Sequence, residues 1–121
     1  TTSHQIVQMA RDAGARKVYL ASAAPPVRYP NIYGIDMPAP EEFIAHERSQ
    51  EEIQRMIGCD WLVYQDLEDL ETAVAGPKFP GMRFDSSCFS GEYVTGVDPA
   101  YFDEIKQQRS DEAKRQRRLA L

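Results

Sequence analysis

The sequence contains little cysteine, little histidine and no long hydrophobic run, and each shortage excludes a class of protein. Its 121 residues include two Cys and two His. Cys59 and Cys88 could form one disulfide but no disulfide framework, and we expect both to be free thiols, as in cytosolic proteins. With so few soft ligands, a zinc site is not expected. No stretch approaches the roughly 20 apolar residues that a membrane-spanning helix needs.

Positive charge is also in deficit, because 14 Lys and Arg face 19 Asp and Glu, for a net charge of −5. This balance argues against a nucleic-acid binder, and the basic cluster at residues 114–118 is expected to be a solvated helix end. No initiator Met precedes Thr1 and no basic-then-apolar leader is present. These absences predict a fragment or processed product that is cytoplasmic and does not associate with a membrane.

The spacing of apolar residues predicts alternating helices and strands. A helix is expected over residues 3–13, with Ser3 as its N-cap and Gly14 as its stop. Residues 17–23 are a continuous apolar run, typical of a buried parallel strand. Further elements are expected as helices at 40–47, 49–57, 66–75 and from 98 onward, a strand at 61–64, and loops at 27–40 and 77–91. This order predicts an α/β architecture with a partial parallel sheet, whose first strand would precede Thr1.

The helix over residues 49–57 has the clearest local signals. Residues 49–52 read Ser-Gln-Glu-Glu, which is a capping box. Ile53, Met56 and Ile57 are expected to face the core, and Gly58 to end the helix.

Two segments could bind a ligand. Thr1, Thr2 and Ser3 stand at the head of a helix, where free N–H groups and hydroxyls can hold an anion. Residues 33–38 form a glycine-hinged loop after a strand, which is where open α/β sheets bind ligands. On the residues alone, an ordinary N-cap and a surface loop that covers the core are the favoured interpretations.

The remaining reactive side chains favour no catalytic role. His46 is flanked by Glu42 and Glu47 and could act as a general base, but a solvated helix residue is the favoured interpretation. Cys88 is not part of a C-x-x-C pair, so neither a redox pair nor a cluster motif is present.

Several stretches resemble one family when they are taken in order along the chain. They are residues 1–15, 17–25, 31–38, 42–46, 51–58 and 88–95. The first two resemble the end of a phosphoribosyltransferase phosphate loop with its helix and the following strand, which would fit any type I phosphoribosyltransferase. The combination, over roughly residues 1–105, is similar to the glutamine phosphoribosylpyrophosphate amidotransferases, also called amidophosphoribosyltransferases.

The resemblance implies that residues 1–76 are the C-terminal part of a type I phosphoribosyltransferase domain and residues 77–121 an extension of loop and helix. It implies a glycosyltransferase reaction. Glutamine is hydrolysed in one domain, and the ammonia displaces pyrophosphate from phosphoribosylpyrophosphate (PRPP) to give phosphoribosylamine, the first step of purine synthesis. It further implies magnesium, purine nucleotides as ligands and a homo-oligomer.

The site residues that the resemblance implies are few. Thr1, Thr2 and Ser3 match the segment that holds the ribose 5′-phosphate, while Asp36 and Met37 match positions that face the transferase site and the ammonia path. The glutaminase nucleophile, the acidic pair before the phosphate loop and the magnesium ligands would all lie outside this chain. We therefore expect no catalytic residue here and no activity from the isolated chain.

One group in this family holds an iron–sulfur cluster on four Cys, and this chain resembles the other, bacterial group. Asn31 and Asp85 stand where the first group has Cys, and Cys88 alone is retained. A set of ligands this incomplete implies that no cluster is bound.

Two further expectations remain open. The rival hypothesis from another class is a non-catalytic α/β interaction or regulatory module on the same scaffold. A sheet that lacks a strand also has an unpaired edge, so the chain is expected to self-associate.

Overall fold

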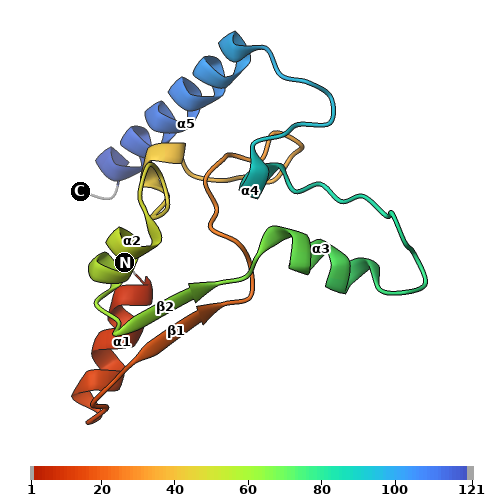
Figure 1. Cartoon of the computed structure of the whole chain (residues 1–121). Coiled ribbons are helices and arrows are strands. Elements are labelled where there is room, and N and C mark those ends of the chain that lie inside the picture. The colour runs from red at the N-terminus through yellow and green to blue at the C-terminus, as the bar shows by residue number, and fades with distance from the viewer. Residues whose placement is uncertain (1, 120–121) are drawn as a thin grey trace. The chain divides into compact units, whose positions relative to one another are not determined.

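The computed structural model describes residues 2–119, with the side chains of all of these except 111–114 and 116–119 (Figure 1). Its elements in chain order are α1 (Thr2–Asp12), β1 (Tyr19–Ser22), the 3-10 turn η1 (Pro40–Glu42), α2 (Gln50–Ile57), β2 (Trp61–Tyr64), α3 (Leu67–Ala75), α4 (Ser87–Ser90) and α5 (Pro99–Leu119). The predicted alternation of helices and strands is confirmed in order.

The chain is divided into two compact units. The first contains the residues up to Pro26 together with Glu47–Arg83, and the second contains Val27–His46 together with the residues from Phe84 onward. The parallel strands and α1 to α3 therefore belong to the first unit. The loop that carries Asp36 belongs to the second, with η1, α4 and α5.

The sheet of the first unit consists of β1 and β2, which run parallel in a register from Tyr19 opposite Trp61 to Ser22 opposite Tyr64. Parallel neighbours need a crossover connection, and α2 directly precedes β2 in that connection. The strand backbone bonds extend one step past the strands, because Gln65 N–H donates to Ser22 O at 3.1 Å.

Apolar side chains from α1, α2, β2 and the turn between α2 and β2 make the core of the first unit. Val7, Ile53, Ile57, Cys59 and Leu62 are all buried. The helix α2 is fixed at both ends, because the capping box of Ser49 and Glu52 is formed and Gly58 ends it in the left-handed region at φ 81°. Burying each large aliphatic side chain contributes roughly 1.5–3 kcal/mol.

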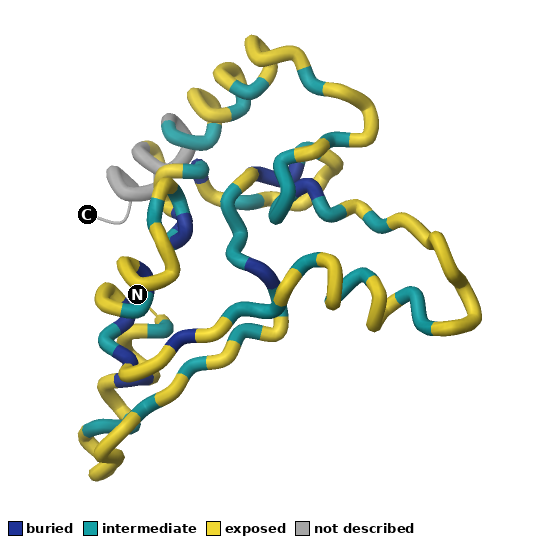
Figure 2. Tube along the Cα trace, viewed as in Figure 1, coloured by how far each residue is buried: buried dark blue, intermediate teal, exposed yellow. Residues whose placement is uncertain are grey.

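The opposite face of the sheet is bare in the part of the chain that the structure describes. Tyr19 and Trp61 meet edge to face with ring centroids 6.0 Å apart, yet they are 60% and 58% exposed. Exposed and less exposed residues alternate along both strands (Figure 2). The prediction of a strand buried on both faces is therefore wrong for β1, because helices cover only the face that holds Leu62.

Four local predictions are corrected. Helix α1 begins at Thr2, so Ser3 lies inside the helix and is not its N-cap. The expected helix over 40–47 is only the turn η1, because Phe43 is already extended and Glu47 has φ 49°, which no α-helix accommodates. Met56 is half exposed rather than buried. Within the expected loop 77–91, Ser87–Ser90 form the single helical turn α4.

The second unit packs its loops around buried small and aromatic residues. Phe43, Ala45 and Ala39 are buried near η1, and the rings of Tyr93 and Phe102 lie 5.0 Å apart by their centroids.

Gly91 ends α4 with φ 76°, and a Cβ atom there would lie 2.9 Å from Cζ of Tyr29. Only glycine fits this approach of the backbone to the ring.

Candidate functional site

The first candidate is the start of α1. Thr2 is exposed and Ser3 half-buried at the head of this 11-residue helix, whereas Thr1 lies outside the described residues. The first N–H groups of a helix have no partner within it and carry the positive end of its dipole. An anion could therefore be bound here by N–H groups and hydroxyls, and the phosphate contacts of Thr2 and Ser3 stay a prediction.

Helix α1 is anchored to the end of α2 by two side chains, His4 in its first turn and Arg11 in its last turn. His4 Nδ1–H donates to the carbonyl oxygen of Ile57 at 3.1 Å, and Arg11 Nη2 donates to that of Gly58 at 2.9 Å. His4 and Arg11 are seven positions apart, which places them on one face of α1 two turns apart. They satisfy carbonyl groups that the end of α2 leaves open, where a cation is also favoured by the dipole.

Asp60 completes this junction from the start of β2. Its carboxylate accepts the Val18 N–H at 2.7 Å and the Arg11 guanidinium at 3.0 Å. The Val18 N–H holds the pKa of Asp60 below its usual value, and Arg11 adds to that shift. Helix α1 and both strands are thereby tied together through one exposed carboxylate.

The second candidate is the loop that contains Asp36 and Met37, within the second unit. Asn31, which is 3% exposed, organises this loop: its Oδ1 accepts the N–H groups of Tyr33 at 2.8 Å and Ile35 at 3.1 Å. The backbone N–H of Asn31 points at the sulfur of Met37, with a distance of 3.2 Å between nitrogen and sulfur. An asparagine that bonds to the backbone just ahead of it closes a compact turn.

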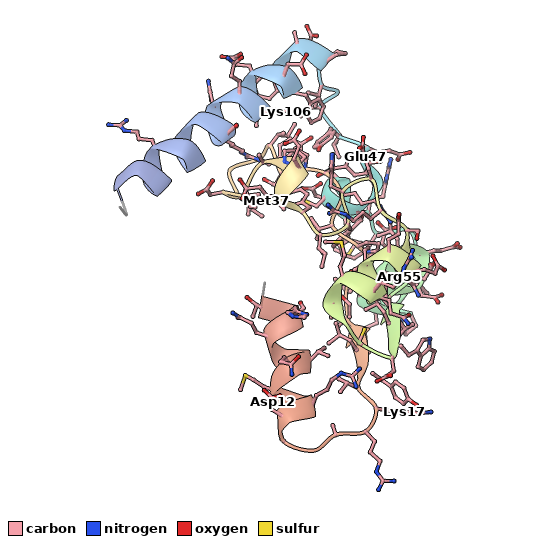
Figure 3. All side chains as sticks on the ribbon, turned by 90° about the vertical axis from the view of Figure 1, so that its left-hand side faces the viewer. Asp12, Lys17, Met37, Glu47, Arg55 and Lys106 are labelled. Carbon is pink, nitrogen blue, oxygen red and sulfur yellow. The ribbon has the colours of Figure 1, made fainter. Side chains whose placement is uncertain are left out.

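Asp36 and Met37 have different surroundings. Asp36 is exposed, while Met37, which is labelled in Figure 3, is half-buried. Its sulfur receives the Cys88 S–H at 3.8 Å. Burial raises the pKa of the Cys88 thiol, and the Asp85 carboxylate raises it further. Cys88 is therefore a protonated thiol and a poor nucleophile, which agrees with a packing role.

Tyr93 and Arg109 support this loop, although no sequence pattern predicted a role for either. Tyr93 donates its hydroxyl to Pro30 O at 2.6 Å, and Arg109 Nη2 donates to Asn31 O at 2.9 Å. Burial, with the nearby Cys88, raises the pKa of Tyr93 to about 12, so its phenol stays neutral and can donate. In the sequence, Tyr93 is only an aromatic residue in a loop, and Arg109 is only the start of a basic tail.

The structure places the predicted site residues in different units, with Thr2 and Ser3 in the first and Asp36 and Met37 in the second. His46, considered above as a general base, lies in a turn where its backbone N–H donates to Phe43 O at 3.1 Å.

Among the described side chains, no three His, Cys, Asp or Glu gather as a metal site would need. The donors near Cys88 are one thiol, the Asn31 amide and the Asp85 carboxylate, a set that does not suit an iron–sulfur cluster. The described helices include none that is both long and apolar enough to cross a membrane.

Comparison with known proteins gives one consistent answer, although no family model matches the chain. The amidophosphoribosyltransferase of Pseudomonas aeruginosa is 59% identical over 115 residues, which are 94% of this chain and 23% of that protein. The enzyme of Escherichia coli K12 is 54% identical over 115 residues, again 94% and 23%. That of Saccharomyces cerevisiae is 46% identical over 109 residues, 90% of this chain and 21% of the relative.

The fold agrees with this sequence similarity. A solved structure of the B. subtilis glutamine PRPP amidotransferase, complexed with ADP and GMP, matches with a TM-score of 0.63 and 37% identity. The match covers 81% of this chain and 22% of that one. The expected fold, a partial parallel sheet with flanking helices as in that phosphoribosyltransferase, is confirmed. The chain spans about a quarter of the length of the relatives that it matches.

Proposed function

We propose that this chain works as part of an amidophosphoribosyltransferase. It matches about a quarter of the length of each of the enzymes compared above. The observation that carries the proposal is 59% identity over 94% of the chain, together with the matching fold. The complete enzyme would hydrolyse glutamine and use the ammonia to displace pyrophosphate from PRPP. The product is phosphoribosylamine, which opens purine synthesis.

In this proposal, residues 1–76 belong to the phosphoribosyltransferase domain and residues 77–121 extend it. Thr1, Thr2 and Ser3 hold the ribose 5′-phosphate. The support for Thr2 and Ser3 is their place at the head of α1, where unpaired N–H groups meet side-chain hydroxyls. His4 holds this end of the helix to Ile57 of α2, while Arg11 holds the other end of α1 to Gly58 and Asp60.

We assign Asp36 and Met37 to the lining of the transferase site and of the ammonia path. An exposed carboxylate next to a half-buried thioether suits a boundary between a polar site and an apolar passage. Met37 is supported by Asn31 and Cys88, so its sulfur has a defined place. Neither residue takes or gives a proton in the reaction we assign, and the catalytic groups belong to other parts of the enzyme.

Magnesium would accompany PRPP, and in this proposal its ligands belong to parts of the enzyme outside this chain. The polar donors around Cys88 favour the group of enzymes that lacks an iron–sulfur cluster. The B. subtilis structure with ADP and GMP supports purine nucleotides as ligands of this enzyme too. We place the enzyme in the cytoplasm as a homo-oligomer that binds no nucleic acid and no membrane.

The relatives named above are all amidophosphoribosyltransferases. The alternative of a non-catalytic interaction or regulatory module therefore has no specific observation in its favour.

A chimera tests the proposal. The matching segment of the Escherichia coli enzyme is replaced by this chain, and phosphoribosylamine formation is measured with ammonia and with glutamine. We expect activity from the chimera and none from the 121-residue chain alone. A folded chimera that hydrolyses glutamine but makes no phosphoribosylamine would contradict the proposal, as would turnover by the isolated chain.

The double variant Thr2→Val with Ser3→Ala tests the phosphate contacts in the same chimera. Because only side-chain hydroxyls are removed, the KM for PRPP should rise about tenfold, the cost of a little over 1 kcal/mol of lost hydrogen bonding. Glutamine hydrolysis provides the control, since it takes place in a different domain. An unchanged KM for PRPP would remove Thr2 and Ser3 from the site.

A further inference from the structure

We propose that Asn31 and Arg109 act together as positioning residues that set the loop carrying Asp36 and Met37. Neither residue was assigned a role by its sequence pattern. The inference rests on the proposed function, because it names the support of a loop that we place at the transferase site.

Asn31 determines the shape of this loop from inside the second unit. Its side chain is buried, and one oxygen, Oδ1, accepts the N–H groups of both Tyr33 and Ile35. Gly34, between these two donors, has φ 102°, a conformation that side chains rarely adopt. The two backbone N–H groups before Asp36 therefore share a single acceptor, and the Tyr33 hydroxyl is bonded to Thr95 Oγ1 at 3.1 Å as a second support of the turn.

Arg109 fixes Asn31 in turn. Its Nη2 donates to Asn31 O at 2.9 Å, and Tyr93 donates to the carbonyl of the preceding residue, Pro30, at 2.6 Å. Two successive carbonyl groups are thus held by long side chains from other segments. A guanidinium suits this task because it is planar and keeps its charge at every physiological pH.

Helix α5 presents Arg109 on a face that is anchored at two more points. Phe102 packs against the Tyr93 ring, and Lys106 pairs with Glu41 of η1. Residues 102, 106 and 109 are spaced four and three apart, which places them on one side of the helix. The Lys106 ammonium, by its hydrogen bond, lowers the pKa of Glu41, so the pair is charged at neutral pH. Phe102, Lys106 and Arg109 therefore all contact other segments of the second unit from one side of α5.

Two contacts connect α5 to Met37. Arg109 donates to the Asn31 carbonyl, and the backbone N–H of Asn31 lies 3.2 Å from the Met37 sulfur, measured from its nitrogen. Nη1 of Arg109 is buried without a hydrogen-bond partner in the described part of the chain, so a buried donor is left unsatisfied to keep the guanidinium here. Reaction geometry is sensitive to displacements of about 1 Å, which can cost on the order of 100-fold in rate. Because Asn31 contacts Tyr33, Ile35 and Met37, a displacement of Asn31 would be passed to the whole loop and would affect catalysis there.

The test uses the complete chimeric enzyme described above, with Asn31→Leu and Arg109→Gln as the disruptive variants. Leucine keeps the size of Asn31 and removes its acceptor. Asn31→Asp keeps the acceptor and is the conservative variant, while Arg115→Gln, at an exposed position of the same helix, is the matched control. Hydrogen exchange of residues 32–37 and ammonia-dependent kinetics are measured for each.

We expect Asn31→Leu and Arg109→Gln to speed exchange at Tyr33 and Ile35 and to lower kcat for phosphoribosylamine by about tenfold or more. Glutamine hydrolysis should be unchanged, Asn31→Asp should recover most of kcat, and Arg115→Gln should behave as the parent. A role in overall folding alone would instead lower the melting temperature and glutamine hydrolysis together, with no recovery in Asn31→Asp.

The outcomes separate the two proposals. Unchanged loop exchange in Arg109→Gln overturns the positioning role whether or not the enzyme is active. Faster exchange with unchanged kcat overturns it as well, because the loop would then move without consequence. If the parent chimera makes no phosphoribosylamine, the proposed function fails, while the exchange data still decide whether Asn31 and Arg109 hold the loop.

Discussion

Truncation of Ile53 to alanine tests how the first unit is held together. Ile53 lies in the middle of α2 and is fully buried, with 0% of its surface exposed. Replacing it by alanine removes three carbon atoms from a packed core. We expect a loss of about 2–5 kcal/mol in the free energy of unfolding, from lost transfer energy and the cavity left behind. For a chain of 121 residues that is a large part of a total stability of about 6–18 kcal/mol.

Met56→Ala is the matched control, because Met56 lies on the same helix and is 50% exposed. Its truncation should cost less than about 1.5 kcal/mol, since about half of the side chain is already in water. Urea unfolding is followed by the fluorescence of the only Trp and by circular dichroism, at a concentration where the chain is monomeric. Equal losses for the two variants would refute the packing described here and would restore the sequence-based prediction that both residues face the core.

Three further predictions concern other features. Gly91→Ala should destabilise the second unit by more than about 1 kcal/mol in urea unfolding, because its φ is positive and the new Cβ meets the Tyr29 ring. The pKa of Asp60 is lowered, chiefly by the Val18 N–H, so its stabilising effect is present above the ordinary carboxyl pKa and is lost as the pH falls through the folded value. Asp60→Asn should remove that part of the acid dependence, measured as melting temperature between pH 6 and about pH 2. Trp61→Ser should weaken self-association in sedimentation velocity, because it reduces the exposed apolar face of the sheet, whereas equal association would leave another surface responsible.

Local signals predicted the ends of some helices well. The capping box of Ser49 and Glu52 and the glycine stop at Gly58 are formed as predicted, and Asp66 caps the helix that was expected over residues 66–75. Each depends on residues within a few positions of one another, so sequence spacing contains the whole cause. Ser3 failed as an N-cap because a serine can also occupy the first turn of a helix, and the local sequence does not separate the two.

Long-range contacts explain most of what the sequence could not predict. The burial of β1 was overestimated because a continuous apolar run does not reveal which sheet face a helix will cover. The support of the Asp36 loop by Tyr93 and Arg109 joins segments about 60 and 80 positions apart. No periodicity links such residues. The family resemblance named Asp36 and Met37 as site residues but gave no account of what holds them.

In each of the two units an arginine donates to a backbone carbonyl. Arg11, at the opposite end of α1 from Thr2 and Ser3, donates to Gly58 O, and Arg109 donates to Asn31 O in the loop that carries Asp36 and Met37. Backbone carbonyls that no helix or sheet uses must find donors elsewhere, and a guanidinium supplies several from one side chain. The hydrophobic core then sets the stability of each unit, while Arg109 sets the shape of the loop proposed to meet substrate. Substitution at Arg109 should therefore change the proposed site more than it changes unfolding, and core truncations such as Ile53→Ala should do the reverse.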